Sequence, residues 1–205
     1  WPAAEAAGLT TPRRIRHFLA RVMVETGSLK AIEESLNYSV EGLLKTFGRH
    51  RITEAQCRAL GRSGSRPADK QGIANIIYGG TWGKQNLGNT EPGDGWRYRG
   101  GGMLQTTGRA GYRALGLEVN PEALREPGPA FLSAVKEWAK RGCNALADRD
   151  DVAGICKAIN GGDNGLAEQR AFLAKAAAIW PDASAAVETR YPVLRRGSKG
   201  TDVIE

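Results

Sequence analysis

Carboxylates are the side chains with which this sequence is best equipped for catalysis. Its two histidines, His17 and His50, lack the setting of a Ser-His-Asp or Cys-His nucleophile. The sequence also contains no GxSxG, HExxH or GxxxxGK[ST] motif. Two carboxyl groups in different environments suffice to hydrolyse a glycosidic bond, because one assists the leaving oxygen as an acid while the other, ionised, activates water. The sequence therefore favours carboxylate chemistry.

Glu25 is the best single candidate for the acid. It lies near the end of a helix predicted between Thr11, the N-cap, and Gly27, in which apolar residues recur at helical spacing. Around that helix Glu25 is within roughly 60° of Phe18 and Val22, at the edge of the apolar stripe. Burial and the negative end of the helix dipole both raise the pKa of such a carboxyl. A half-buried glutamate paired with an arginine explains the position equally well.

The elements that position this residue are predicted to be helices. The sequence predicts helices at about 39–47, 53–60, 67–78, 107–115, 129–141, 151–159 and 166–179. Thr53 and Gln56 have the spacing of a capping box, and Pro67 suits a first helical turn. Strand signals are nearly absent. The expected fold class is therefore mainly α, with any sheet confined to a small hairpin near the glycine-rich segment.

Residues 78–104 are rich in glycine and also contain Trp82, Trp96 and Tyr98. So long a glycine-rich segment in a compact domain is usually functional or disordered, and the aromatics argue against disorder. We expect an ordered binding loop. Its aromatic rings either stack on sugar faces, which we favour for Tyr98, or hold the loop to the core, which we favour for Trp96.

Four blocks of the sequence resemble glycoside hydrolase family 19, which contains chitinases and phage endolysins. They are 24–29 (VETGSL), 33–39 (EESLNYS), 92–109 (PGDGWRYRGGGMLQTTGR) and 159–162 (INGG). The blocks occur in the family's order, and the resemblance covers about residues 13–180. The Asn-Tyr-Ser and Pro-Gly-Asp-Gly-Trp stretches resemble the endolysin branch.

The resemblance implies a lysozyme-like, two-lobed helical fold with a central groove and an inverting mechanism. It assigns Glu25 as the general acid and Glu34 as the general base. Inversion requires the two carboxyl groups to be about 6.5–9.5 Å apart, which leaves room for the attacking water. On one continuous helix, nine residues would separate them by about 13 Å along the axis. Because Gly27 ends the helix, the chain is able to turn and bring Glu34 across the groove.

The resemblance also implies roles for several polar residues. By position, Thr107 helps to hold the water, Gln105 and Asn160 bind the sugar chain, and Arg170 lies near the acid. Glu91, in the glycine-rich segment, is the reserve candidate for the base.

The sequence departs from the family pattern at two positions. Gly101 replaces the arginine of a Gly-Arg-Gly stretch, and Gly111 replaces an asparagine before Tyr112. The loss of that asparagine places more of the water positioning on Thr107, or lowers activity.

Residues 1–180 are expected to form the catalytic domain, followed by a linker at 181–192. Residues 193–205 resemble the opening of a small peptidoglycan-binding domain, cut off at Glu205. The alternative is a basic, disordered tail.

Composition and net charge limit the classes of partner that this protein is expected to bind. The net charge of +7 suits polyanions, among them acidic envelope polymers, but the basic residues are scattered and no nucleic-acid-binding signature is present. Three cysteines in no metal-binding spacing favour free thiols, with a Cys143–Cys156 bridge as the alternative. We expect no metal or other cofactor, no nucleic-acid partner, no membrane span and a monomer.

The expected function is an endolysin-type glycosidase that cuts β-1,4 bonds of peptidoglycan strands. We expect the protein to be made in the host cytoplasm without a visible signal peptide and to act on the cell wall in the periplasm. The alternatives are a chitinase and a non-catalytic wall-binding lectin.

Overall fold

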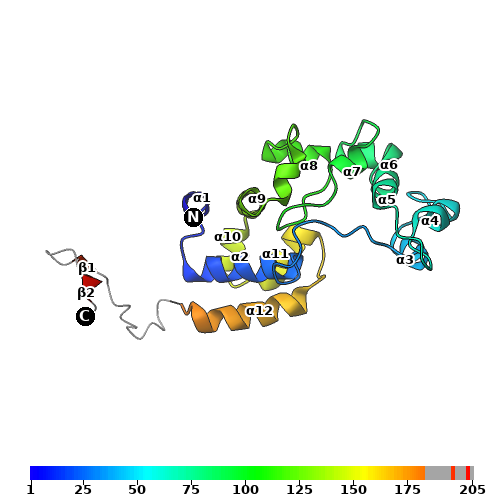
Figure 1. Cartoon of the computed structure of the whole chain (residues 1–205). Helices are drawn as coiled ribbons and strands as arrows, with labels where there is room; N and C mark the ends of the chain where they lie inside the picture. Colours follow the sequence, from blue (N-terminus) through cyan, green and yellow to red (C-terminus); the bar gives the residue numbers. More distant parts are fainter. Residues whose placement is uncertain (183–194, 197–201, 204–205) are drawn as a thin grey trace.

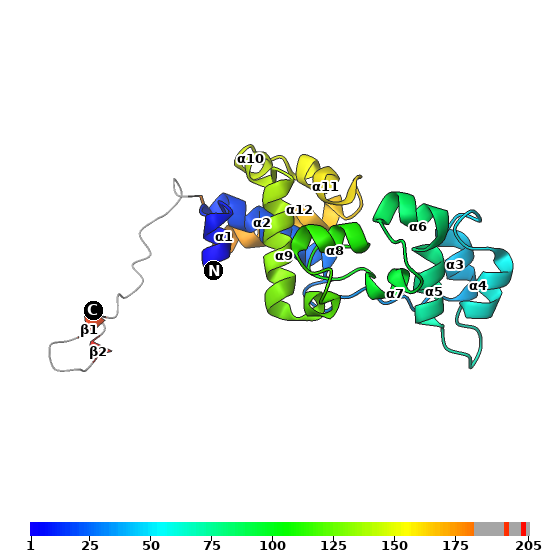
Figure 2. The same ribbon diagram turned by 90° about the horizontal axis from the view of Figure 1, so that it is seen from above.

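Helices form two lobes in the computed structural model, which describes residues 1–182, 195–196 and 202–203 (Figures 1 and 2). The first lobe contains α1 (Pro2–Ala6), α2 (Pro12–Glu25), α9 (Pro127–Lys140), α10 (Cys143–Asp148), α11 (Val152–Asn160) and α12 (Leu166–Ile179). The second contains α3 (Val40–Thr46), α4 (Glu54–Leu60), α5 (Lys70–Ile77), α6 (Gly80–Leu87) and α7 (Asp94–Arg97). Helix α8 (Arg109–Leu115) lies between them (Figure 2), and the 3-10 helix η1 (Pro121–Arg125) packs against α9. The predicted fold class, mainly α with two lobes, is confirmed.

Each lobe has its own apolar core. In the first, Phe18 of α2 packs edge-to-face on Trp138 of α9, with ring centroids 5.5 Å apart. In the second, Leu43 of α3 packs with Ile73 of α5. A third, smaller cluster forms around Tyr112 of α8. The chain between α2 and α3 runs from the first core to the second, and this segment carries Glu34.

Local sequence signals set most helix boundaries. The N–H of Arg14 donates to the side chain of Thr11 at 3.2 Å, which caps α2 as predicted. Thr53 and Gln56 form the predicted capping box at the start of α4.

The helix predicted at 67–78 begins later, at Lys70. The reason is that the side chain of Asp69 accepts a hydrogen bond from the N–H of Gly72 and so caps α5.

The glycine-rich segment differs from the prediction. We expected an ordered loop throughout, whereas α6 and α7 lie within it. The error comes from the role of the glycines, which stand at helix ends: Gly88 (φ +69°) follows α6 and Gly93 (φ +88°) precedes α7.

Near that segment the described residues contain only isolated bridges, between Glu33 and Gly101 and between Gly101 and Thr106. The hairpin allowed for at this place does not form. The described residues contain one two-stranded antiparallel sheet, β1 (Arg195–Arg196) with β2 (Asp202–Val203).

Helices α1 and α10 and the 3-10 helix η1 were not predicted from the sequence. Most of the predicted linker, and the greater part of the predicted wall-binding segment, lie outside the described residues.

Cys57, Cys143 and Cys156 are buried and free, which confirms the expectation of free thiols. Within the part of the chain that the structure describes, no helix has the length and apolar character needed to cross a bilayer.

Candidate active site

Glu25 is the last residue of α2 and therefore stands where the first lobe meets the segment leading to the second. The hydroxyl of Thr26 donates to the carbonyl of Val22 and accepts from the N–H of Leu29, which closes the end of the helix. Gly27 (φ +55°) then turns the chain away, as its position predicts. The turn leaves the side chain of Glu25 17% exposed at the helix end.

Arg21, one turn earlier on α2, forms an ion pair with Glu25 through its Nη2 and the glutamate Oε1. The guanidinium is only 2% exposed. Its Nη1 donates to Oε1 of Gln169 at 3.1 Å and contacts Sγ of Cys156 at 3.2 Å. Burial lowers the pKa of Arg21, which still carries its charge near neutrality. A fixed, buried cation therefore stands beside the candidate acid.

The arginine partner differs from the one suggested by the family resemblance. Arg170 is exposed on α12, and among the described ion pairs the partner of Glu25 is Arg21. The pairing that the sequence left as an alternative interpretation of Glu25 is thus present. Nearby charge of this kind favours the ionised form of a carboxyl, so it opposes the effects of burial and of the helix dipole.

Glu34 is held quite differently, by two neutral donors. Its Oε2 accepts from the hydroxyl of Tyr78 at 2.7 Å, and its Oε1 accepts from the N–H of Gly100 at 2.5 Å. Its own N–H donates to the carbonyl of Gly100 at 3.0 Å. These contacts bring the segment after α2 against the glycine run 100–102, far along the chain. Hydrogen bonds of this kind stabilise an ionised carboxylate, the form a general base requires.

Tyr78 is suited to remain a donor. Burial, together with the neighbouring carboxylate of Glu34, raises the pKa of Tyr78 well above its ordinary value. The hydroxyl therefore stays protonated at neutral pH and continues to hold Glu34. Tyr38 lies in the same region, and burial likewise raises its pKa.

The glycine run 100–102 allows the backbone to approach these side chains closely. A Cβ at Gly100 would lie 3.1 Å from Oε1 of Glu34 and 3.1 Å from Oε1 of Gln105. A Cβ at Gly101 would lie 2.9 Å from the hydroxyl of Tyr112. The departure from the family pattern at Gly101 thus has a physical reason, since the buried Tyr112 occupies the space that a side chain would need.

Gln105 and Thr107 follow the glycine run. Gln105 has a left-handed backbone (φ +52°), and its side-chain amide donates to the carbonyl of Gly102 at 3.3 Å. The hydroxyl of Thr107 donates to the carbonyl of Gln105 at 3.1 Å. Gln105 is close to Glu34, because both approach the position of a Cβ on Gly100.

Thr107 and Gly111 line a small cavity of about 170 Å³. A Cβ at Gly111 would meet Cγ2 of Thr106 at 2.9 Å. An asparagine at this position, as in the family pattern, would therefore require Thr106 to move.

Asn160 ends α11 and is exposed. Its side-chain amide donates to the carbonyl of Asn164 at 2.7 Å and accepts from the N–H of Gly162 at 3.0 Å. It therefore shapes the loop after α11, and its predicted role in binding sugar stays a prediction.

Tyr98 is not available to a sugar ring. Its side chain lies in the third apolar cluster at 1% exposure, and its hydroxyl donates to the carbonyl of Glu118 at 3.2 Å. The predicted substrate contact through Tyr98 is wrong, because a buried ring offers no face for stacking. Trp96 packs on the core of the second lobe, beneath the guanidinium of Arg99 at 4.0 Å, in agreement with a role in holding the segment.

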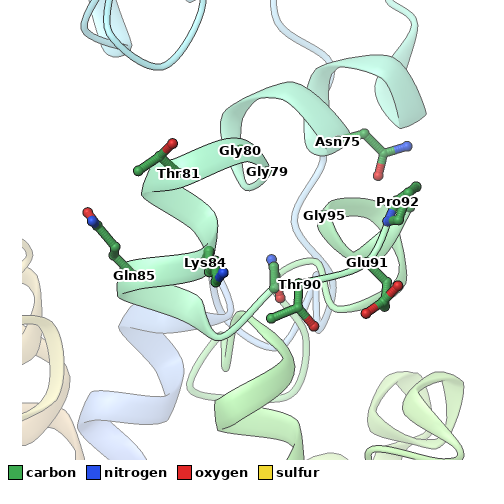
Figure 3. Close-up of a pocket in the computed structure, with 12 residues that line it drawn as sticks. Asn75, Gly79, Gly80, Thr81, Lys84, Gln85, Thr90, Glu91, Pro92 and Gly95 are labelled. Carbon is green, nitrogen blue, oxygen red and sulfur yellow. The ribbon is translucent and has the colours of Figure 1, made fainter.

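The reserve base, Glu91, is exposed and takes no part in the described hydrogen bonds of Glu34. It lines a cavity of about 810 Å³ between α6 and the loop before α7 (Figure 3). Within the described residues, no group of three or more His, Cys, Asp or Glu side chains is placed to hold a metal ion.

Sequence reasoning missed Arg21 and Tyr78. Arg21 is four residues before Glu25, a spacing that places both on one helix face and signals an ion pair. Tyr78 meets Glu34 across 44 residues of chain, and no local pattern indicates that contact.

A two-lobed helical fold with one carboxylate beside a cation and a second held by neutral donors has the parts of a glycosidase. A glycosyl hydrolase family 19 domain-containing protein of Haemophilus influenzae is 34% identical to this chain over 172 residues, which cover 80% of the chain and 79% of the relative. No family model matches the chain. The chain belongs to glycoside hydrolase family 19.

Proposed function

We propose that this protein is an endolysin-type glycosidase that hydrolyses β-1,4 bonds of peptidoglycan strands with inversion. The observation that carries the proposal is the unequal setting of the two carboxylates. Glu34 is fixed through both oxygens by Tyr78 and Gly100, whereas Glu25 uses one oxygen to meet Arg21. A base whose two oxygens are oriented by hydrogen bonds and an acid with a second oxygen free of described hydrogen bonds are the pair proposed to carry out inversion.

In this proposal Glu34 takes a proton from the water that attacks the sugar's anomeric carbon. A carboxylate oxygen has about two acceptor sites, so each oxygen of Glu34 retains one beyond the hydrogen bond described. Thr107 helps to hold the water, and Gln105 and Asn160 bind the sugar chain.

Glu25 donates its proton to the leaving oxygen. Among the described hydrogen bonds its Oε2 has no partner, and this is the atom proposed to carry the proton. The nearby Arg21 makes the carboxyl a stronger acid, which assists proton donation but lowers the fraction protonated at neutral pH.

The choice of peptidoglycan rests on the endolysin-like blocks of the sequence and on the net charge of +7. A basic protein concentrates at acidic envelope polymers. We propose that the protein acts at the cell wall, as a monomer.

Purified Gram-negative sacculi test the proposal. The wild type should release new reducing ends, and mass analysis of the soluble muropeptides should show a glycosidic cleavage and identify the new reducing-end sugar. Sacculi left intact, or full release by both Glu25→Gln and Glu34→Gln, would contradict it. Cleavage of chitin oligomers in place of sacculi would favour the chitinase.

One observation favours a non-catalytic lectin as the second candidate. The ion pair between Arg21 and Glu25 stabilises the ionised carboxylate, which is unable to donate a proton. The absence of a side-chain amide at Gly111 also favours the lectin. Binding of sacculi without release of reducing ends would establish the lectin.

A further inference from the structure

A cavity in the second lobe adjoins the residue that follows Tyr78 and has no role in the mechanism proposed above. Its volume is about 810 Å³, and its walls come from the end of α5, from α6, from the loop 88–93 and from the start of α7. Gly79, in its wall, directly follows Tyr78, whose hydroxyl binds Glu34. A ligand in this cavity would therefore contact the residue next to the one whose side chain holds Glu34.

The walls of the cavity carry both signs of charge. Figure 3 shows Lys84 on α6 and Glu91 on the facing loop, with Thr90 between them. Lys84 and Glu91 are exposed, and neither takes part in an ion pair among the described residues. Gln85 and Thr81 add an amide and a hydroxyl. No aromatic side chain lines the cavity, so it lacks the flat apolar surface on which a sugar ring stacks.

Hydrogen bonds to a buried side chain hold the loop that carries Glu91 in place. Asp94, 3% exposed, accepts from the N–H groups of Thr90 and Glu91 at 2.9 and 3.0 Å. Arg109 donates to both oxygens of Asp94, at 2.9 and 2.7 Å. Because these contacts hold the loop in place, a ligand would not have to order it on binding.

Glycines keep the cavity open. Gly80 (φ +59°) and Gly93 (φ +88°) both line it, and a Cβ on either would meet no atom within 4 Å. The cavity is therefore present in the folded protein without a ligand, and neither of these two residues has a side chain that could fill it.

We propose that this cavity binds the peptide branch of peptidoglycan, with Lys84 receiving a carboxylate of the peptide and Glu91 facing its amino group. This assignment rests on the proposed function, because only a peptidoglycan strand carries such branches. Chitin has neither carboxylates nor peptide amines, so the cavity would give the enzyme a preference for peptide-bearing strands.

The test compares soluble peptide-bearing strands with strands from the same sacculi stripped of peptides by an amidase. The wild type should show a kcat/KM about tenfold higher on the peptide-bearing strands, the effect of one charge-assisted hydrogen bond. In Lys84→Ala that ratio should fall towards one. Lys84→Arg should retain most of it, and Lys175→Ala, an exposed lysine on α12, should retain all of it.

Calorimetric titration gives a second readout that does not require turnover. The probes are a disaccharide with its peptide and the same disaccharide without it. The wild type should bind the first about tenfold more tightly, and Lys84→Ala should lose the difference.

The outcomes separate the two proposals. Hydrolysis of neither strand contradicts the proposed function, and the titration then decides on the cavity. Hydrolysis of both strands at a ratio near one, or a ratio and a binding difference that Lys84→Ala leaves unchanged, overturns the cavity assignment alone.

Discussion

Glu25 and Glu34 are nine residues apart, yet the protein surrounds them in opposite ways. Glu25 ends a helix and meets Arg21, a buried cation that is itself held by Gln169. Glu34 lies in an irregular segment and meets two neutral donors, one from a side chain and one from the backbone at Gly100. The contacts of Glu25 come from the first lobe, and those of Glu34 come from Tyr78, the C-cap of α5, and from the glycine run.

The difference separates two ways of controlling a carboxylate. A neighbouring cation attracts the ionised carboxylate and therefore makes the carboxyl a stronger acid. This attraction depends on salt and on pH. Neutral donors fix the orientation of both oxygens without adding a charge. If the two residues act as acid and base, changes at Arg21 should alter the pH dependence, and changes at Tyr78 or Gly100 should alter the rate.

Glu34→Gln should cause the largest loss. It removes the acceptor for the proton of water, and general base catalysis is typically worth 10²- to 10⁴-fold. The rate of reducing-end release from peptide-free glycan strands measures it, and circular dichroism checks that the fold is retained. A larger loss of rate in Glu91→Gln than in Glu34→Gln would make Glu91 the base and would contradict the comparison between Glu25 and Glu34 as acid and base.

Arg21→Met should destabilise the protein by about 2–4 kcal/mol, because it leaves Glu25 half-buried without its cation. Urea unfolding measures the loss. The alkaline limb of the pH–rate profile should also move to higher pH, because without the cation the carboxyl loses its proton less readily.

Arg58→Met is the matched control. Arg58 forms an i, i+4 pair with Glu54, but both side chains are more than half exposed. Such pairs contribute little, so the stability should barely change. Equal losses from the two variants would show that the buried position of Arg21 is unimportant.

Tyr78→Phe should lower the rate about tenfold by removing one of the two hydrogen bonds that hold Glu34. Because burial raises the pKa of Tyr78, the wild type should not lose rate through its ionisation between pH 7 and about 10. Tyr38→Phe is the control, since the described hydrogen bonds include none from Tyr38 to Glu34. An unchanged rate in Tyr78→Phe would mean that the orientation of Glu34 does not depend on this contact.

Gly100→Ala should have the smallest effect, a loss of about threefold in rate, because the added Cβ displaces Glu34 and Gln105 by a few tenths of an ångström. Gly128→Ala on α9 has open space around its Cβ and should leave the rate unchanged. Steady-state kinetics on the same strands distinguishes the two. A rate retained in Gly100→Ala would indicate that Glu34 tolerates movement.

The sequence predicted those parts of the structure that depend on local chemistry. The cap at Thr11, the capping box at Thr53 and the turn at Gly27 each need only neighbouring residues, and all three were predicted correctly. The four sequence blocks that resemble the family predicted the fold and the family correctly, because each block is also a short motif of neighbouring residues.

The parts that depend on distant contacts were not predictable in this way. Tyr98 was expected at the surface because aromatic residues near glycines suit a binding loop, but its ring is covered by the distant Tyr112 and Leu124. The contact of Tyr78 with Glu34 joins segments far apart in the chain. The roles of Glu25, Glu34 and Thr107 stay predictions until they are tested.

The anomeric configuration of the first product tests the central claim most directly, namely that Glu25 and Glu34 act on opposite faces of one β-linked sugar. Proton NMR of the anomeric region, recorded during the first minutes of cleavage of peptide-free strands, reads the new reducing end before mutarotation mixes the forms. Inversion predicts that the α-anomer appears first. The β-anomer appearing first would show retention and contradict the assignment of Glu34 as the base.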